Sequence, residues 1–501
     1  MNTKYTIILQ PAIYSSIIIN RQWVWKIPFL RKKIELFFKY YSYPHSYQTL
    51  YVIIMDALFQ RFIARGGIDF QQHQHDAVSW CIANENATEP VTGVRGGFIA
   101  DEMGLGKTIS IIALIVCNFR LYKKTLIVLP NILLQQWRHE IFRTTGHQPL
   151  IYHGSAKKKI LLTHLNRATI VLTTYSAIAL SLRRPTQNPL HLVQWDRLVF
   201  DEAHHLRNRN SRFIGARALN ARARWLVSGT PIQNKKRDFF NMCSVLGLPA
   251  SFYTDSSKNP ILFSNHVLRR TKSHVGIQFT SLQQHSKLVQ WNDTNEHNLS
   301  IDIHNALAAS SEKLKFILKA RQSCILPALL DPALHSSSKL DAVIDAILLN
   351  KHNGNGKLVF CHFHQEIDFI FNKITLYNIP VARFDGRLSI KQRANLLLSP
   401  PTVLILQIQT ASEGLNLQHH FSEIYFVSPH WNPAVQDQAV ARCHRIGQTK
   451  PVSVYNYAMN TLLPLTLPLT EPQQIDNIEQ HILLTQTNKK LLSDSHFYKH
   501  T

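Results

Sequence analysis

A glycine-containing loop followed by lysine and threonine is the segment best suited to chemistry. The run IADEMGLGKTIS (99–110) starts in an apolar stretch and leads into an amphipathic one, so we expect a strand, a loop and a helix. Backbone amides from Gly104 and Gly106 into the helix would hold a β-phosphate at the positive end of the helix dipole. Lys107 would reach the β- and γ-phosphates, and the Thr108 hydroxyl would bind Mg²⁺.

A G-K-T run after a strand also arises by chance, and Asp101 stands where the usual phosphate-loop pattern has its first glycine. A second motif, made of two adjacent carboxylates, supports the first. The run RLVFDEAH (197–204) ends an apolar stretch in this acidic pair. Asp201 would hold Mg²⁺, Glu202 would orient and deprotonate the attacking water, and His204 would link the site to a second lobe. Together the two motifs predict nucleotide hydrolysis.

Short apolar runs in two groups are the elements that must position these residues. Runs without polar alternation predict strands buried on both faces, and hence parallel sheets covered by helices. The sequence therefore predicts two α/β units joined by a mostly helical stretch at about 236–340, with polar loops such as SLQQHSK. The runs are 96–100, 125–130, 168–175, 197–205 and 224–231, then 356–363, 380–386, 402–407, 423–429 and 451–459.

Composition narrows the class of partner. The 501 residues predict about two to four domains. Lys and Arg total 55 against 31 Asp and Glu, a net charge of +24, which favours nucleic acid or an anionic membrane surface as partner. A basic proteome without a specific partner is the alternative. The apolar segment 5–19 is too short and interrupted for a membrane span, so we expect it to be a buried strand or hairpin. The six cysteines contain no C-x-x-C pair, which favours reduced thiols in an intracellular compartment.

The order of sequence blocks resembles the Swi/Snf-type DNA-dependent ATPases of helicase superfamily two. The resemblance implies two RecA-like lobes, with Gln74 recognising the adenine of ATP and Ser228 and Thr230 coupling hydrolysis to lobe movement. LKARQSCILPALL is similar to a run of the branch that includes DNA-repair translocases. The other blocks of the first half are FQQHQHDAVSW (70–80), LPNILLQQWRHEI (129–141), VLTTYSAI (171–178), SGTPIQN (228–234) and HVLRRTKSHV (266–275).

The second half carries the remaining blocks of the resemblance. Gln438, Arg442 and Arg445 follow a spacing of i, i+4 and i+7, which predicts one face of a helix. Two guanidiniums there could stabilise charge on a transferring γ-phosphoryl group, as arginine fingers do. The resemblance also assigns Gly414 to coupling. The blocks are FDGRLSIKQR (384–393), EGLNLQ (413–418) and WNPAVQDQAVARCHRIGQTKPV (431–452).

The resemblance also implies domain boundaries and shows two departures. QTASEG (409–414) has Ala411 and Ser412 where relatives have glycine, which puts the turnover rate in doubt. The short region 251–310 has no clustered cysteines, so no RING insertion is expected. The expected domains are an unassigned segment (1–69), an ATP-binding lobe (70–250), a helical interlobe region (251–340), a C-terminal helicase lobe (341–470) and a closing brace helix with a tail (471–501).

The favoured function is an ATP-dependent translocase on double-stranded DNA that remodels protein–DNA complexes in repair, transcription or chromatin. Contacts to phosphates would make binding independent of sequence. The nucleus or a viral replication compartment is the expected location, protein cargo on DNA is a further expected partner, and the oligomeric state stays open. A strand-separating DNA or RNA helicase and a decayed motor that acts as a DNA-binding scaffold are the alternatives. The basic clusters are 31–33, 157–159, 235–237 and 269–270.

Overall fold

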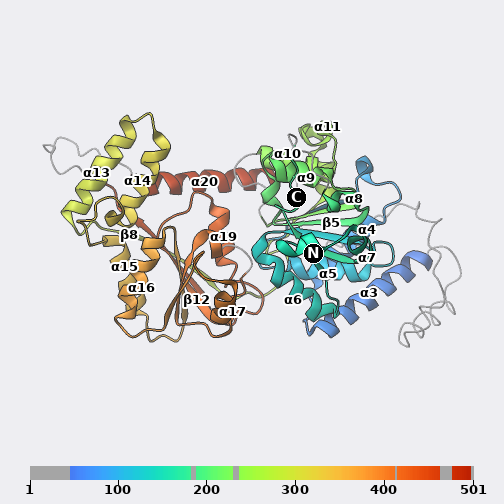
Figure 1. Cartoon of the computed structure of the whole chain (residues 1–501), viewed down its shortest axis with the longest axis horizontal. Helices are drawn as coiled ribbons and strands as arrows, with labels where there is room; N and C mark the ends of the chain where they lie inside the picture. The colour runs from blue at the N-terminus through green and yellow to red at the C-terminus, as the bar shows by residue number, and fades with distance from the viewer. Residues whose placement is uncertain (1–45, 182–187, 230–235, 412–414, 463–476, 498–501) are drawn as a thin grey trace, which may run out of the picture. The chain divides into compact units, whose positions relative to one another are not determined.

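The chain folds into two parallel-sheet units. The computed structural model describes residues 46–181, 188–229, 236–411, 415–462 and 477–497. One unit consists mainly of residues up to Val275 and the other mainly of those from Gly276 onward. Each unit is a parallel β-sheet with helices packed on it (Figure 1), which confirms the predicted RecA-like α/β fold. The apolar segment 5–19, expected to be a strand or hairpin, lies outside the described residues.

The sheet of the first unit has seven strands in the order β3-β4-β2-β5-β6-β1-β7, and all its pairs are parallel. The five apolar runs expected in this half form the five inner strands, β4, β2, β5, β6 and β1. The sequence did not predict β3 and β7, which are the two edge strands. The bounds are β1 (Gly96–Ile99), β2 (Thr125–Leu129), β3 (Leu150–Tyr152), β4 (Ile170–Thr174), β5 (Trp195–Asp201), β6 (Ala221–Val227) and β7 (Val267–Leu268).

The helices of the first unit supply most of its core. Helix α5 is fully buried at Ile111, Ile112 and Leu114, because α3, α4 and α6 surround it. The helices are α3 (Ser46–Gly66), α4 (Gln72–Glu85), α5 (Lys107–Cys117), α6 (Leu134–Thr145), α7 (Leu162–Arg167), α8 (Pro189–Leu192), α9 (Ser211–Ala218), α10 (Lys236–Leu246), α11 (Ala250–Tyr253) and α12 (Asn259–His266). The short 3₁₀ helices are η1 (Val91–Gly93), η2 (Asn131–Leu133), η3 (Ser155–Lys159), η4 (Ala203–Leu206) and η5 (Ser256–Lys258).

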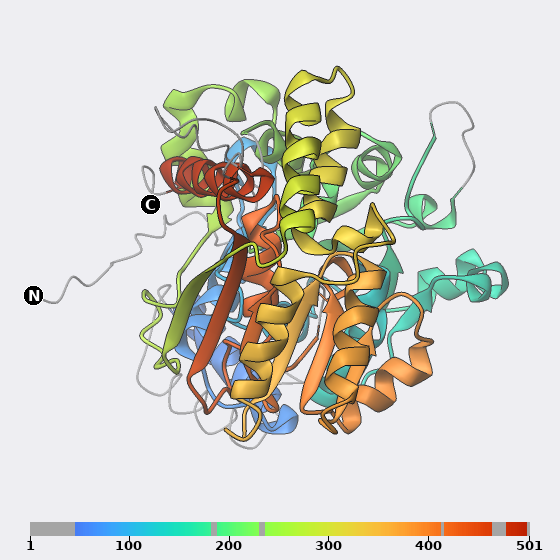
Figure 2. The same cartoon turned by 90° about the vertical axis from the view of Figure 1, so that its left-hand side faces the viewer.

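The sheet of the second unit has six parallel strands in the order β10-β11-β9-β12-β13-β8. The expectation that SLQQHSK forms a polar loop is wrong. Most of this segment belongs to β8, which pairs with β13 along its whole length (Figure 2). The other expected runs form β9 to β13. The bounds are β8 (Leu282–Val289), β9 (Gly356–Cys361), β10 (Val381–Phe384), β11 (Val403–Gln407), β12 (Phe421–Phe426) and β13 (Val452–Met459).

Helices α13 and α14 form an antiparallel pair that stands away from the sheet of this unit (Figure 1). The predicted helical pattern EKLKFILKARQSC forms α14, and the expected brace segment contains α20. The helices are α13 (Thr294–Ala309), α14 (Lys313–Ile325), η6 (Pro327–Leu329), α15 (Ser338–Leu349), α16 (His364–Thr375), α17 (Ile390–Leu398), α18 (Ile408–Ala411), α19 (Pro433–Val440) and α20 (Ile478–Phe497).

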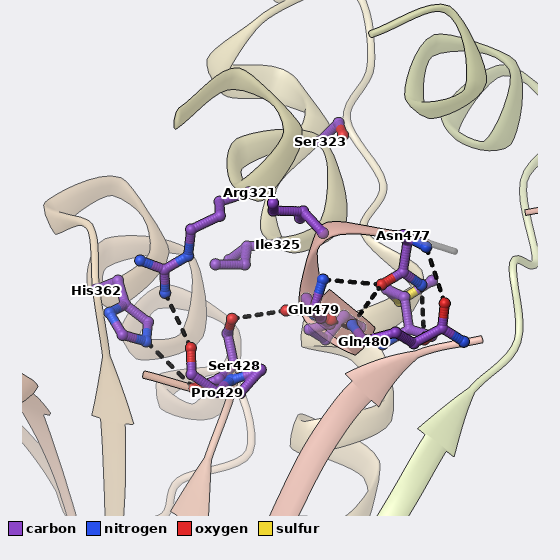
Figure 3. A network of polar contacts seen from close by, with 12 residues as sticks. Arg321, Ser323, Ile325, His362, Ser428, Pro429, Asn477, Glu479 and Gln480 are labelled. Atoms are coloured by element: carbon purple, nitrogen blue, oxygen red, sulfur yellow. Dashed lines mark hydrogen bonds and ion pairs between the residues drawn. The ribbon is translucent and has the colours of Figure 1, made fainter. Parts of the chain in front are cut away.

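A buried polar network holds the start of α20 against the sheet of the second unit (Figure 3). The Lys339 ammonium on α15 contacts both carboxylate oxygens of Glu479, and both side chains are 0% exposed. The Ser428 hydroxyl, after β12, donates to Glu479 at 2.6 Å, and the Met459 amide at the end of β13 donates at 2.8 Å. Because every one of these donors points at one carboxylate, the network joins α15 and the ends of β12 and β13 to α20 at a single buried point.

Among the described residues, no helix has the length and apolar character to cross a bilayer. All six cysteines lie within the described residues as free thiols, and five of them are buried. Burial raises the pKa of these thiols, for example to about 12 for Cys324. A thiol with a raised pKa is a poor nucleophile, so the cysteines act as apolar packing groups.

Candidate nucleotide site

Three neighbouring strands of the first unit end at the same edge of the sheet. β6 pairs with β1 on one side and β5 on the other, and Val227 is in register with both Ile99 and Asp201. Asp101 follows β1 by two residues and Ser228 follows β6 directly. The carboxyl ends of strands in open parallel sheets are where such folds bind ligands. The structure thus brings the phosphate loop, the acidic pair and the start of SGTPIQN to one place.

The phosphate loop has backbone geometry that requires glycine. Gly104 has a φ of +93° and Gly106 a φ of +78°, and α5 begins at the next residue, Lys107. A Cβ on Gly106 would lie 2.2 Å from the Gln74 side-chain nitrogen, so the adenine-recognising candidate packs directly on the loop. The Lys107 amine donates to the Asp101 carbonyl at 2.8 Å, and its side chain therefore lies along the loop. A bare backbone at the start of a helix is the cradle that a phosphate needs.

Asp101, the departure from the usual phosphate-loop pattern, has a partner in the structure. The residue is 2% exposed, and its carboxylate accepts hydrogen bonds from the Arg270 amide and Nε, both at 3.0 Å, and from Nη2. In the sequence, Arg270 forms a basic cluster with Arg269. Its guanidinium instead lies mostly inside the first unit, paired with the phosphate loop.

The Asp201 carboxylate is held by two donors. The Trp137 indole nitrogen on α6 donates to one oxygen at 2.8 Å, and the Glu202 amide donates to the other at 3.1 Å. The Tyr175 hydroxyl donates to the Asp201 carbonyl at 2.7 Å. Burial and then the neighbouring charge of Glu202 raise the pKa of Asp201 to about 6. A bound cation would offset this, because a nearby positive charge favours the ionised carboxylate.

Glu202 takes a conformation that non-glycine residues rarely adopt. Its φ is 51° and its ψ is 51°, at the turn between β5 and η4. Left-handed backbone at a residue with a side chain is costly and often marks a functional position. The turn separates Glu202 from the strand and brings its carboxylate to 3.4 Å from the His204 Nδ1. The rings of His204 and His205 stack with centroids 4.7 Å apart.

The residues at this edge fit a nucleotide with Mg²⁺. Thr108 offers a hydroxyl and Asp201 a carboxylate, which are the oxygen ligands that Mg²⁺ prefers. Within the described parts of the chain, no group of three or more His, Cys, Asp and Glu side chains forms a dedicated metal cage. Mg²⁺ bound by one or two protein oxygens and the substrate phosphates needs no such cage.

The arginine pair of the second unit is not on a helix. Gln438 lies on α19, but the helix ends at Val440, so the expectation that Arg442 and Arg445 share its face is wrong. The Arg442 carbonyl accepts a hydrogen bond from the Leu417 amide at 3.1 Å and its amide bonds only three residues back, which ends the helical pattern. Both arginines lie in irregular turns.

These turns pack against the EGLNLQ block of the same unit. The Arg445 guanidinium donates to the Asn416 side chain, and the Gln438 side chain is buried. Thr230 and Gly414, two of the expected coupling residues, lie outside the described residues, as does Ser412 of the QTASEG departure. The two blocks are therefore neighbours within the second unit.

Sequence reasoning missed two residues that position this site. Trp137 occurs in the block LPNILLQQWRHEI (129–141), and its indole nitrogen could have indicated this hydrogen bond, because such a donor needs a partner when it is buried. Arg270 could have been suspected because Asp101 in the phosphate loop needs a counter-charge once buried. The basic run Lys157–Lys159, by contrast, is exposed on η3 as a solvated cluster would be.

Two family models match the chain. The model described as SNF2-related domain matches residues 73–327, and the model described as helicase conserved C-terminal domain matches residues 338–447. Among solved structures, the chain is similar to the Sulfolobus solfataricus SWI2/SNF2 ATPase core in complex with dsDNA. The likeness has 24% identity and a TM-score of 0.39, and it covers 78% of this chain and 88% of that one.

Similar proteins come from a bacterium, a virus and a fish. The chain is 28% identical to an uncharacterised ATP-dependent helicase of Mycoplasma genitalium, over 86% of this chain and 43% of that protein. It is 27% identical to a probable global transactivator of Orgyia pseudotsugata multicapsid polyhedrosis virus, over 77% of this chain and 85% of that protein. It is 24% identical to the DNA excision repair protein ERCC-6-like of Danio rerio, over 72% of this chain and 33% of that protein. The chain therefore spans less than half of the bacterial and fish proteins.

Proposed function

Because the chain belongs to the SNF2-related family of helicase-like proteins, we propose that it hydrolyses ATP and uses the energy to move along double-stranded DNA. The observation that carries the proposal is the meeting of phosphate loop, acidic pair and β6 end at one sheet edge of the first unit. Such an arrangement can bind a triphosphate and activate a water molecule. A protein that only bound the nucleotide would not need the group that activates water.

The residues of the first unit divide the work of hydrolysis. Lys107 and the loop amides bind the phosphates, and Gln74 reads the adenine. Glu202 orients the attacking water and takes its proton. Mg²⁺, held by Thr108 and Asp201 together with the phosphates, would neutralise charge on the transferring group. Trp137 keeps the Asp201 carboxylate aimed at that position through its 2.8 Å hydrogen bond.

The residues of the second unit and of the coupling blocks complete the proposed cycle. Arg442 and Arg445 stabilise charge on the γ-phosphoryl group, and His204, Ser228 and Gln438 report the state of the nucleotide, together with Thr230 and Gly414. An Arg445→Ala variant should bind ATP with wild-type affinity and hydrolyse it at a reduced rate. Full hydrolysis by that variant would contradict the role given to Arg445.

Duplex DNA is the proposed track, contacted through its phosphates. A net charge of +24 and exposed lysines such as Lys157–Lys159 support a polyanionic partner without base readout. One relative is named for excision repair and another as a transactivator, so the proposed cargo is protein bound to DNA in repair, transcription or chromatin. We propose the nucleus or a viral replication compartment as the place of action.

The test is steady-state ATP hydrolysis with no nucleic acid, duplex DNA, single-stranded DNA or RNA, at low and moderate salt. We expect strong stimulation by the duplex, weakened by salt, and its loss in Lys107→Ala. Lys123→Ala, which removes an exposed lysine of the same unit, is the matched control and should hydrolyse ATP normally. Displacement of a third strand from a triplex then measures movement without strand separation.

Other outcomes select other functions. Stimulation by single strands alone, with strand release from a forked duplex, would replace the translocase with a strand-separating helicase. Tight duplex binding without hydrolysis under any condition would indicate a decayed motor that serves as a scaffold.

A further inference from the structure

One guanidinium joins the two segments that would bind opposite ends of the nucleotide. Arg270 lies two residues after β7 and is mostly buried. Its amide, Nε and Nη2 donate to the Asp101 carboxylate, and its Nη1 donates to the His73 carbonyl on α4 at 2.5 Å. A planar group with five fixed donors can make such a double contact, whereas the single ammonium of a lysine cannot reproduce it.

The two partners of Arg270 belong to different parts of the candidate site. On one side, Asp101 opens the phosphate loop, and its carbonyl accepts the hydrogen bond from Lys107 at 2.8 Å. On the other side, His73 directly precedes Gln74, the residue proposed to read adenine.

The contacts form a closed ring through the site. The Gln74 side-chain nitrogen packs so closely on Gly106 that a Cβ there would lie 2.2 Å away. From Gly106 the chain leads to Lys107, from Lys107 to the Asp101 carbonyl, and from the Asp101 carboxylate through Arg270 back to α4. Arg270 belongs to neither the phosphate loop nor α4, and its guanidinium bonds to both.

We propose that Arg270 is a positioning residue that sets the base-reading helix α4 in register with the phosphate loop. The inference rests on the nucleotide-binding part of the proposed function, and it is independent of DNA. Without Arg270, the side chains of Gln74 and Lys107 remain but are no longer held at a fixed distance from each other. The protein then cannot gain binding energy from the base and from the phosphates of the same nucleotide together.

The test compares variants that break the ring at different points, by equilibrium binding of fluorescent ATP and GTP analogues without DNA. Asp101→Asn keeps the His73 contact, so it should weaken both nucleotides about tenfold and leave the ATP-to-GTP ratio unchanged. Arg270→Ala should weaken ATP by a similar factor and also reduce the ratio to that of Gln74→Ala. A melting temperature is measured for each variant.

Arg224→Ala is the structural control. Arg224, in the middle of β6, has a largely buried guanidinium that donates to the carbonyls of Ala216, Val245 and Leu219. It should lower the melting temperature without changing the ATP-to-GTP ratio. Arg270→Lys keeps a charge beside Asp101 but loses the double contact, so it should reduce the ratio in a folded protein even if Arg270→Ala does not fold.

An unchanged ratio in folded Arg270→Ala or Arg270→Lys would overturn the proposal, as would wild-type protein with no preference for ATP. A lack of stimulation by duplex DNA, with the ratio behaving as expected, would overturn the translocase function and leave the role of Arg270 standing.

Discussion

Replacing Lys339 by methionine should destabilise the second unit far more than removing the whole ion pair. Lys339 and Glu479 are both 0% exposed, and Glu479 keeps its bonds from Ser428 and Met459 when the lysine is gone. A buried carboxylate without its counter-charge costs about 3–5 kcal/mol. The double variant Lys339→Met/Glu479→Gln carries no charge at this pair. The oxygen of its glutamine can still accept from the Met459 amide, and its amide nitrogen can donate to the Ser428 hydroxyl. We therefore expect it to lie within about 1 kcal/mol of the wild type.

Hydrogen-exchange mass spectrometry suits this protein, because two units rarely unfold in one two-state transition. Peptides from β13 and α20 report opening of the network, and peptides from β5 in the first unit serve as an internal control. A loss of about 3 kcal/mol corresponds to roughly hundredfold faster exchange in Lys339→Met. Glu479→Gln alone leaves the Lys339 ammonium buried without its counter-charge. It should show a loss of stability, and an increase in exchange rate, of similar size.

The wild type, the two single variants and the double variant form a double-mutant cycle. We expect the coupling free energy between Lys339 and Glu479 to be at least about 3 kcal/mol. If the double variant lost as much protection as the two single losses added together, the pair would not be coupled. The account of the network as one buried unit would then be refuted.

Two further predictions concern the nucleotide site and the response to pH. Trp137→Phe keeps an aromatic ring but removes the donor to Asp201, so we expect the rate of ATP hydrolysis to fall about tenfold or more; an unchanged rate and Mg²⁺ dependence would contradict the role of Trp137. Burial raises the pKa of Glu366 from 4.5 to about 7, so the folded state binds this proton more tightly and loses stability as pH rises between those values. The stability gain of Glu366→Gln over the wild type, measured in thermal melts at pH 5 and pH 8, should be larger at pH 8 by about 3 kcal/mol or less.

Burial on both faces decided which strands could be predicted. β2 is buried at all five positions and its apolar run TLIVL predicted a strand directly. β8 is an edge strand with six of its eight residues exposed, and main-chain pairing to β13 along its whole length is its main support. Side-chain type carries no signal in such a case, so the polar letters of SLQQHSK favoured a loop.

Residue spacing along the sequence predicted only part of the site, because several of its contacts join segments that are distant in the sequence. The phosphate loop and the acidic pair could be predicted because their residue types and order suffice for the chemistry. The helical spacing of Arg442 and Arg445 failed because α19 ends at Val440, and the Arg442 carbonyl bonds to Leu417 from another segment. Likewise, nothing near Asp101 in the sequence indicates Arg270, whose bond to it spans 169 positions.

The place of β8 at the edge of its sheet determines when the second unit can be completed during synthesis. Leu282 pairs with Val452, so about 170 residues must follow β8 before its partner strand exists. At about 5–20 residues per second, β8 waits on the order of ten to thirty seconds with unpaired main-chain groups. Unpaired strands attract other chains, and polar or charged side chains such as Gln283, Gln284 and Lys287 oppose that association. The polar composition that made β8 hard to predict as a strand thus opposes association of the nascent chain with other chains until β13 has been synthesised.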